Sequence, residues 1–206
     1  LQLGQEQYIY GKATEHIAEG NVVMFGGAQG GHILISNATS AALNTNCNYV
    51  VGIATQDIAS NAYGYVTWFG KVNGINTSIW AEGTILYFDH GSPGKLTATM
   101  PTAPDAKITV AAVTRSHATQ GSIMVRPAFG SRLRTLHDVN ITTQNNGDVL
   151  VWNTSASRWE NTTPTAEMIG LGNVTNESKE SLLDSVTITT YQETLCPLVT
   201  SYTREP

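Results

Sequence analysis

The chain has 206 residues and a formal net charge of −5, and only 13% of its residues are charged. An ordinary soluble domain carries about 25% charged residues. Here Asn, Thr and Ser take their place, a composition typical of β-structure and assembly contacts. Lys and Arg form no cluster, which excludes a surface for nucleic acid. No apolar run approaches the ~18 residues of a membrane-spanning helix, which excludes membrane insertion.

Residues 1–129 contain eight short apolar runs that are rich in Val, Ile, Tyr and Thr. They are separated by turn signals such as Gly26-Gly27, Asn73-Gly74 and Ser92-Pro93-Gly94, and no segment keeps a helical period over several turns. Short, evenly spaced strands predict an all-β fold, with a small barrel or sandwich in this part of the chain. The runs are Tyr8–Tyr10, Val22–Phe25, His32–Ile35, Tyr49–Ala54, Tyr65–Phe69, Thr84–Phe88, Ile108–Val113 and Ser122–Val125.

An internal repeat runs through the same region. The segment 18–25 matches 81–88, and each begins with an Ala-Glu-Gly turn that leads into an alternating strand. Further along, 50–55 matches 109–114, and each leads through a polar loop to a glycine and another strand. We interpret these matches as a duplication, with coincidence of turn chemistry as the alternative. Two similar half-sheets would then close on each other into one barrel with few free edges.

The histidines form no recognisable metal-binding or catalytic pattern. No two of them lie two to five residues apart, so a zinc or iron site of local spacing is not expected. We place all of them in exposed positions or loops. They are His16, His32, His90, His117 and His137.

The carboxylates also lack an obvious pairing. Asp57, Glu82, Asp89 and Asp105 occupy predicted turns, where such side chains cap backbone N–H groups. The Gly-rich stretch 26–31 lacks the Lys-Ser/Thr of a phosphate loop and is expected to form a flexible hairpin tip. We therefore expect a protein that is not an enzyme, with no catalytic residue, no metal and no cofactor.

Aromatic side chains gather in one predicted strand, where Tyr63, Tyr65 and Trp68 lie close to Phe69. Strand alternation would place Tyr65 and Phe69 on one face and Trp68 on the other. The favoured interpretation assigns these side chains to the barrel core or to a subunit interface. The alternative is an exposed surface for host sugars, with Tyr63, Tyr65 and Trp68 as the contact residues.

Large apolar side chains become sparse after Ser131. We divide the chain into a β-barrel domain at 1–129, a linker at 130–136, a trimeric β-hairpin module at 137–164, and a segment at 165–206 with a shaft linker and C-terminal strands.

The hairpin module is predicted from the alternation of Asp148–Trp152, followed by a turn at 154–157 and a return strand that begins at Trp159. A two-stranded hairpin is barely stable alone, and a small region with so thin a core needs neighbours. Identical neighbours are the simplest solution, so we expect an intertwined homotrimer. Its interchain core would consist of Leu136, Val139, Ile141, Val149, Val151, Trp152, Trp159 and Leu171.

Two motifs in this region carry a family resemblance. Residues 136–161, with the segments LHDVNI, GDVLVWN and SRWEN, resemble a small hairpin module of bacteriophage tail fibres, and GLGNVTNESKESL at 170–182 is similar to their recurrent shaft linker. Residues 11–127 more loosely resemble the β-barrel modules of phage decoration and fibre proteins. The resemblance implies a parallel homotrimer on the virion, with modules strung along a threefold axis and no cofactor.

The function that follows is that of a structural virion protein, a trimeric tail-fibre component that mediates host attachment or links fibre to tail. Its expected partners are two identical chains, other tail or capsid proteins, and a glycan or protein of the host surface. The alternative is a capsid decoration or head-fibre protein. A glycan-cleaving tailspike ranks third, because the chain is short and lacks solenoid repeats. The chain ends soon after its shaft motif, which leaves little room for a separate receptor-binding tip.

Overall fold

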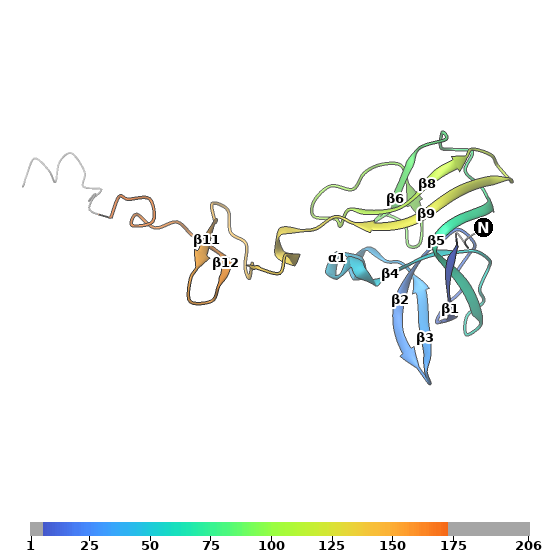
Figure 1. Ribbon diagram of the computed structural model, residues 1–206, viewed down its shortest axis with the longest axis horizontal. Helices are drawn as coiled ribbons and strands as arrows, with labels where there is room; N and C mark the ends of the chain where they lie inside the picture. The colour runs from blue at the N-terminus through green and yellow to red at the C-terminus, as the bar shows by residue number, and fades with distance from the viewer. Residues whose placement is uncertain (1–5, 173–206) are drawn as a thin grey trace, which may run out of the picture. The chain divides into compact units, whose positions relative to one another are not determined.

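A computed structural model of the protein describes residues 6–172. The chain divides into two compact units, Leu1–Leu136 and His137–Pro206, which are coloured blue to yellow and orange in Figure 1. We describe each unit separately. The greater part of the shaft motif and the predicted C-terminal strands lie outside the described residues.

The regular secondary structure of the first unit is almost entirely β-strand (Figure 1), as predicted. All eight predicted strands are confirmed, and the short β7 is an addition. The helical segments are short, because no amphipathic period supports a longer helix. The strands are β1 (Gln7–Ala13), β2 (Val22–Gln29), β3 (His32–Asn37), β4 (Val50–Ala54), β5 (Tyr63–Ile75), β6 (Ile85–Phe88), β7 (Leu96–Thr97), β8 (Ile108–Arg115) and β9 (Gly121–Phe129); the helical segments are α1 (Ser40–Thr45), η1 (Cys47–Tyr49) and η2 (Leu133–Thr135).

Five of these strands form a closed barrel. The sheet order is β1-β3-β2-β4-β5-β9-β8-β6-β7, and an additional pairing joins β1 to β5. Strand β1 runs parallel to β3, with Lys12 opposite Leu34, and antiparallel to β5, with Tyr10 opposite Tyr65. It thereby closes the ring β1-β3-β2-β4-β5 and leaves these strands without a long free edge.

The matched sequence segments form equivalent strands with the same register. Val22 lies opposite Ile53, and Ile85 lies opposite Ala112, as the sequence matches require. In both pairs of strands a bulge follows one residue later, between Val23 and Met24 and between Leu86 and Tyr87. The pairing order β3-β2-β4-β5 is thus repeated as β7-β6-β8-β9.

We call the strands β1–β5 the first set and β5–β9 the second set. The two sets do not close on each other around one axis, and in this respect our expectation is wrong. Strand β5 is 13 residues long and serves both sets. Its first half pairs with β1, whereas the second half, from Gly70 onward, pairs with β9. The first set closes through β1, while no pairing within residues 6–136 joins β7 to β5. The long strand therefore links a closed barrel to an open second sheet.

The first unit contains two hydrophobic cores. The barrel interior is filled from alternate positions of its strands, including Val23, Val51 and Val66. A second core holds Val22 and Val50 from the same strands, together with Phe88 and other side chains of the second set. Strand β4 is consequently buried along its whole length, which explains why it reads as a continuous apolar run and not as an alternating one.

Two turn signals in the sequence are not turns. Gly26-Gly27 lies within β2, where a bulge interrupts the pairing with β3, and the hairpin tip is Gly30-Gly31. Asn73-Gly74 lies within β5, where a bulge accompanies the pairing with β9. Glycine accommodates the bulge geometry as readily as a turn, so the local sequence does not distinguish the two.

The second unit contains a small sheet in the order β10-β12-β11, formed by β10 (Val139–Asn140), β11 (Val149–Asn153) and β12 (Arg158–Thr162). The predicted hairpin is confirmed, with Trp152 opposite Trp159. Strand β10 pairs in parallel with β12 and was not predicted. No hydrophobic side chain among residues 137–172 is fully buried, so this sheet has no core of its own.

Candidate functional site

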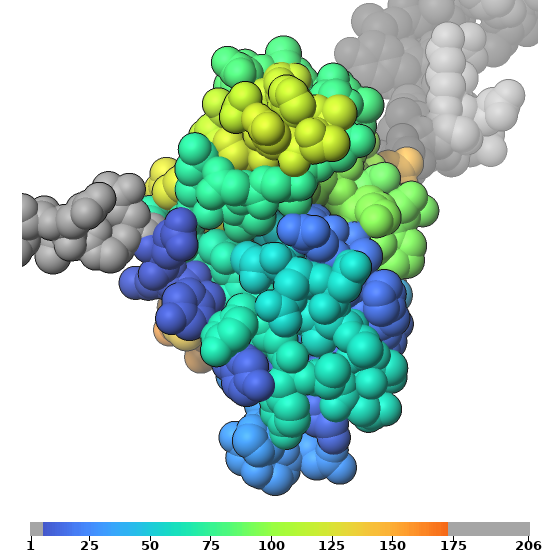
Figure 2. Space-filling view, turned by 90° about the vertical axis from the view of Figure 1, so that its right-hand side faces the viewer, coloured from blue at the N-terminus to red at the C-terminus, as the bar shows by residue number. Residues whose placement is uncertain are grey.

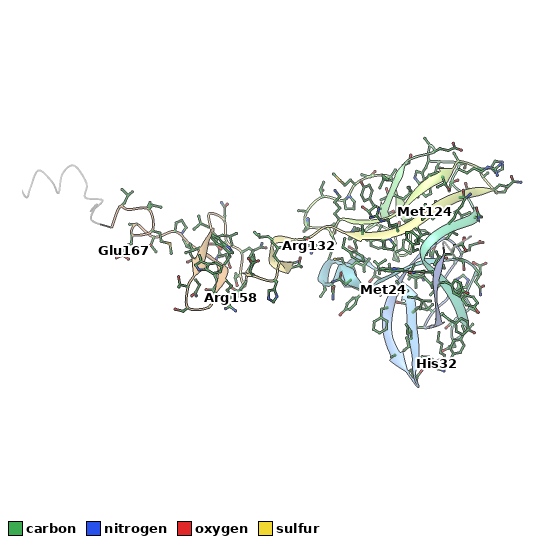
Figure 3. All side chains as sticks on the ribbon, viewed as in Figure 1. Met24, His32, Met124, Arg132, Arg158 and Glu167 are labelled. Atoms are coloured by element: carbon green, nitrogen blue, oxygen red, sulfur yellow. The ribbon has the colours of Figure 1, made fainter. Side chains whose placement is uncertain are left out.

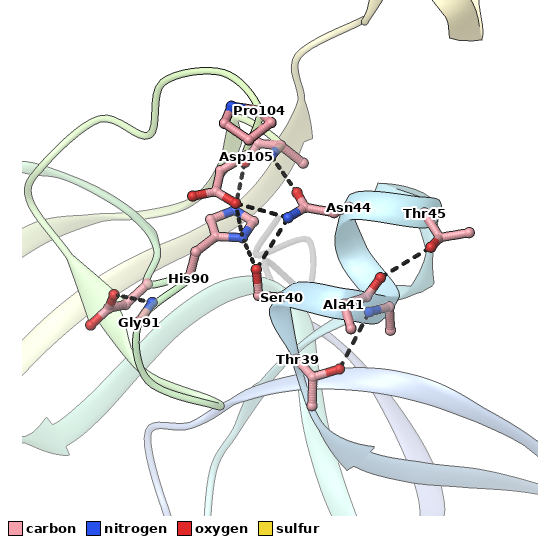
Figure 4. A network of polar contacts seen from close by, with 12 residues as sticks. Thr39, Ser40, Ala41, Asn44, Thr45, His90, Gly91, Pro104 and Asp105 are labelled. Atoms are coloured by element: carbon pink, nitrogen blue, oxygen red, sulfur yellow. Dashed lines mark hydrogen bonds and ion pairs between the residues drawn. The ribbon is translucent and has the colours of Figure 1, made fainter. Parts of the chain in front are cut away.

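A partly buried polar network in the first unit contains a serine, a histidine and an aspartate (Figure 4). Ser40 Oγ lies 2.9 Å from His90 Nδ1, and Asp105 Oδ1 lies 3.5 Å from the same nitrogen. His90 Nε2 lies 2.8 Å from the carbonyl oxygen of Ala106. The His90 side chain is only 7% exposed, but the residue lies in the turn after β6, so the prediction of a loop position holds for it.

The geometry differs from that of a catalytic triad. In a triad, serine and aspartate contact opposite nitrogens of the imidazole ring, whereas here both are closest to Nδ1. A carbonyl oxygen only accepts, so Nε2 carries a proton, and with that tautomer Nδ1 accepts from the Ser40 hydroxyl. The network thus fixes the ring, which comes from the loop after β6, between α1 and the loop that precedes β8.

Arg132 fastens the end of the first unit to the same network (Figure 3). Its guanidinium group donates to Asn44 O at 2.7 Å, to Asn44 Oδ1 at 2.9 Å and to Pro104 O at 2.7 Å. Asn44 Nδ2 in turn donates to Asp105 Oδ1 at 2.8 Å. The arrangement joins three segments that are distant in sequence, which is a structural role.

Replacing Arg132 with alanine is therefore expected to lower the free energy of unfolding of the first unit by about 2 kcal/mol, since hydrogen bonds from a charged donor contribute about 1.5–3 kcal/mol. Urea unfolding followed by circular dichroism measures the change. Arg134→Ala is the matched control, because Arg134 is exposed in the same segment. Equal stability of the two variants would contradict the role given to Arg132.

The carboxylates largely act as backbone caps, as predicted. Asp57 accepts from the Glu19 N–H at 2.9 Å. Asp89 accepts from the Gly91 N–H at 2.9 Å. Glu82 accepts from the Ser116 N–H at 3.3 Å. Asp105 differs, because its carboxylate contacts the side chains of Asn44 and His90.

The part of the chain that the structure describes holds no group of three or more His, Cys, Asp or Glu residues placed to bind a metal ion. Among the same residues, no helix has the length and apolar character that crossing a membrane requires. That the chain is not an enzyme stays a prediction.

Four tyrosines form a continuous aromatic surface on the outside of the barrel, which we call the tyrosine ladder: Tyr8 and Tyr10 of β1, and Tyr63 and Tyr65 of β5. Tyr10 stacks on Tyr63 with ring centroids 5.4 Å apart. It also meets Tyr65 at 4.9 Å, and Tyr8 meets Tyr65 edge-on at 5.2 Å. Figure 2 shows the first residues of the chain (dark blue) beside those of β5 (green-blue) on one face.

The exposure of the tyrosines contradicts one half of our interpretation, the barrel core, whereas the other half, a subunit interface, stays a prediction. Tyr63 and Tyr65 are 37% and 45% exposed, and Tyr8 is 65% exposed. Trp68 is partly buried and takes part in none of the ring contacts of the ladder. Tyr8 and Tyr10 were not among the predicted contact residues, although the alternation Tyr8-Ile9-Tyr10 was a signal for one aromatic face.

The second unit presents its tryptophans to the surface. Trp152 and Trp159 meet edge-on at 5.6 Å and are 45% and 40% exposed. Among the other side chains assigned to the interchain core, Leu136, Val149 and Leu171 are exposed, whereas Val139, Ile141 and Val151 are half-buried. Whether other chains cover these side chains stays a prediction.

Two carboxylates organise the polar side of the hairpin. The Asn145 N–H and the Asn161 side chain donate to Asp148 at 3.0 and 2.7 Å and lower the pKa of its carboxyl group. Asn153 and then Arg158 (Figure 3) donate to Glu160 at 2.9 and 2.7 Å and lower its pKa. Both carboxyl groups are therefore stabilised in the charged form.

This lowering gives the hairpin an acid-sensitive contribution to stability. A carboxyl group whose pKa is lower in the folded state stabilises that state above its unfolded pKa, about 4, and the contribution is lost as the pH falls through the folded pKa. We expect the melting temperature of the hairpin to stay constant above about pH 4 and to fall as the pH is lowered below that value. The test compares the melting of the wild-type chain with that of Asp148→Asn, monitored by the NMR signals of the tryptophan side chains. An identical acid dependence of the two melting temperatures would contradict this expectation.

Comparison with known proteins assigns the chain to no family. No family model matches the chain, and no curated protein matches it. A solved structure, the head fiber gp8.5 N base of bacteriophage phi29, has 14% sequence identity and covers 58% of this chain and 93% of its own, with a TM-score of 0.39. Neither the identity nor the TM-score is high enough for this likeness to bear on function.

Proposed function

We propose that the chain is a structural component of a bacteriophage tail fibre that assembles as a parallel homotrimer and mediates host attachment or links fibre to tail. The partners would be two identical chains and other proteins of the virion. The sequence resemblance of residues 136–161 and 170–182 supports the fibre assignment, and the exposed hairpin side chains support the assembly.

The observation that carries the proposal is the exposure of both tryptophans in a sheet without a core. A tryptophan side chain contributes up to about 250 Å² of surface, so the exposed part of each ring is roughly 100 Å² and its burial would stabilise by about 2.5 kcal/mol. Both rings project from one small hairpin. Packing of identical hairpins around an axis would remove these side chains from water in every chain at once.

Immunogold labelling of intact phage particles tests the placement. Antibodies raised against the purified full chain should label the tail. Labelling of the capsid surface would contradict the tail assignment and favour the alternative, a head-fibre or decoration protein. Absence of label from every particle would contradict a virion role altogether. A fibre that cleaves glycans would in addition release reducing ends from host polysaccharide, which we do not expect.

A further inference from the structure

The second set of strands shows which residues occupy the positions of the tyrosine ladder in the other half of the repeat. Gly64 pairs with Gly11 in the barrel, and the equivalent Gly121 pairs with Ile75 in the second sheet. Counting from these pairs, the ladder positions in the second set hold Lys71 for Tyr8, Asn73 for Tyr10, Gln120 for Tyr63 and Ser122 for Tyr65. A bulge between Asn73 and Ile75 interrupts the second pairing, but the two strands still pair there without any of the four rings. Strand pairing itself therefore does not require the rings.

The rings of the ladder hold one another in place. Each of the four rings contacts at least one other, and His32 meets Tyr63 edge-on at 5.1 Å. Tyr8 and Tyr10 nevertheless remain 65% and 54% exposed. Rings that are already fixed by their neighbours lose little conformational entropy on binding. Each presents both an apolar face and a hydroxyl group that donates and accepts.

A pocket of about 710 Å³ adjoins one end of the ladder. Tyr8 belongs to both, and the other lining residues are Glu6, Gln7, Ile9 and Trp68. The pocket thus combines an indole ring with a carboxylate and a carboxamide. Aromatic faces pack against the C–H surfaces of sugar rings, and carboxylates and amides hydrogen-bond to sugar hydroxyl groups, so the pocket adds polar selectivity to the apolar ladder.

We infer that the ladder and this pocket together bind a neutral carbohydrate chain of the host surface, an inference that deepens the host-attachment role in the proposed function. The four rings are uncharged. Of the charged side chains beside them, Lys12 lies opposite Tyr63 in the pairing of β1 with β5, and Glu6 lines the pocket, so their opposite charges leave no net formal charge. A single-stranded nucleic acid would also stack on aromatic rings, but it requires a cationic groove, and the chain has 16 acidic residues against 11 Lys and Arg.

The test is titration of the purified full chain with three neutral hexasaccharides, cellohexaose, maltohexaose and chitohexaose, followed by tryptophan fluorescence. We expect saturable binding of at least one of them below about 10 mM. Tyr10→Asn and Tyr65→Ser introduce the residues of the second set, and each should weaken that binding about tenfold, the effect of one aromatic stacking contact. Tyr49→Ala, at an exposed tyrosine outside the ladder, should bind like the wild type.

Several results would overturn the inference. These are no binding of any of the three oligosaccharides, equal binding by the wild type and both ladder variants, or a drop in the solution mass of Tyr10→Asn, which would make the ladder an interface between protein chains. Circular dichroism of the variants confirms that they are folded. A trimer that binds no sugar would refute this inference and leave the assembly intact, whereas a monomer that binds sugar would refute only the assembly.

Discussion

Trp152→Asp is expected to reduce the solution mass of the full chain from that of three chains to that of one. In the isolated unit Trp152 is 45% exposed, so a carboxylate is tolerated there while the chain is alone. In an interchain core the same carboxylate would be desolvated without a partner, which costs several kcal/mol per chain. Sedimentation velocity at several protein concentrations measures the result.

Two further variants make this result specific. Trp152→Phe keeps an aromatic ring and should retain the trimer. Ile79→Asp places the same charge on a side chain of the first unit that is 77% exposed and should also retain it. Persistence of the three-chain mass in Trp152→Asp would show that this ring lies outside the interface.

Gly52→Ala is expected to lower the free energy of unfolding of the first unit by at least about 3 kcal/mol, as backbone overlap in a core does. A Cβ atom at Gly52 would lie 2.0 Å from the carbonyl oxygen of Thr67, and the φ of +149° is one that side chains rarely adopt. Both atoms belong to paired strands of the closed barrel, so β4 and β5 would have to separate. Urea unfolding of the full chain measures the loss.

Gly74→Ala is the matched control for this variant. Gly74 also has a positive φ, +87°, but a Cβ atom there meets nothing within 4 Å. The Gly74→Ala variant should lose only the free energy of placing a side chain at a positive φ, about 1–2 kcal/mol. A comparable loss in the two variants would contradict the close approach of the strands at Gly52. In the second set the equivalent position holds Ala111, which lies opposite Val125 of β9, beside a shift in the pairing register.

The strands could be predicted because they are short, apolar and separated by polar segments, and the repeat register could be predicted because matched turns precede matched strands. The role of β1 could not, since closure of the barrel depends on its pairing with two distant strands. Local sequence was also misleading at Gly26-Gly27 and Asn73-Gly74, where glycine serves a bulge within a strand.

The candidate site was only half visible in the sequence for the same reason. Tyr63 and Tyr65 were recognised as an aromatic cluster, but their partners Tyr8 and Tyr10 come from a strand more than fifty positions earlier in the chain. Period-two alternation shows that side chains share a face, not whether that face is inside or outside. Similarly, nothing near His90 indicates that Ser40 and Asp105 enclose its ring.

The central claim is that the hairpin of residues 149–162 is completed by two further copies of the chain. Sedimentation equilibrium of the full chain tests it most directly, because it gives the mass without reference to shape. We expect three times the chain mass of 22.1 kDa. A mass of one chain, with the hairpin folded by NMR, would contradict it.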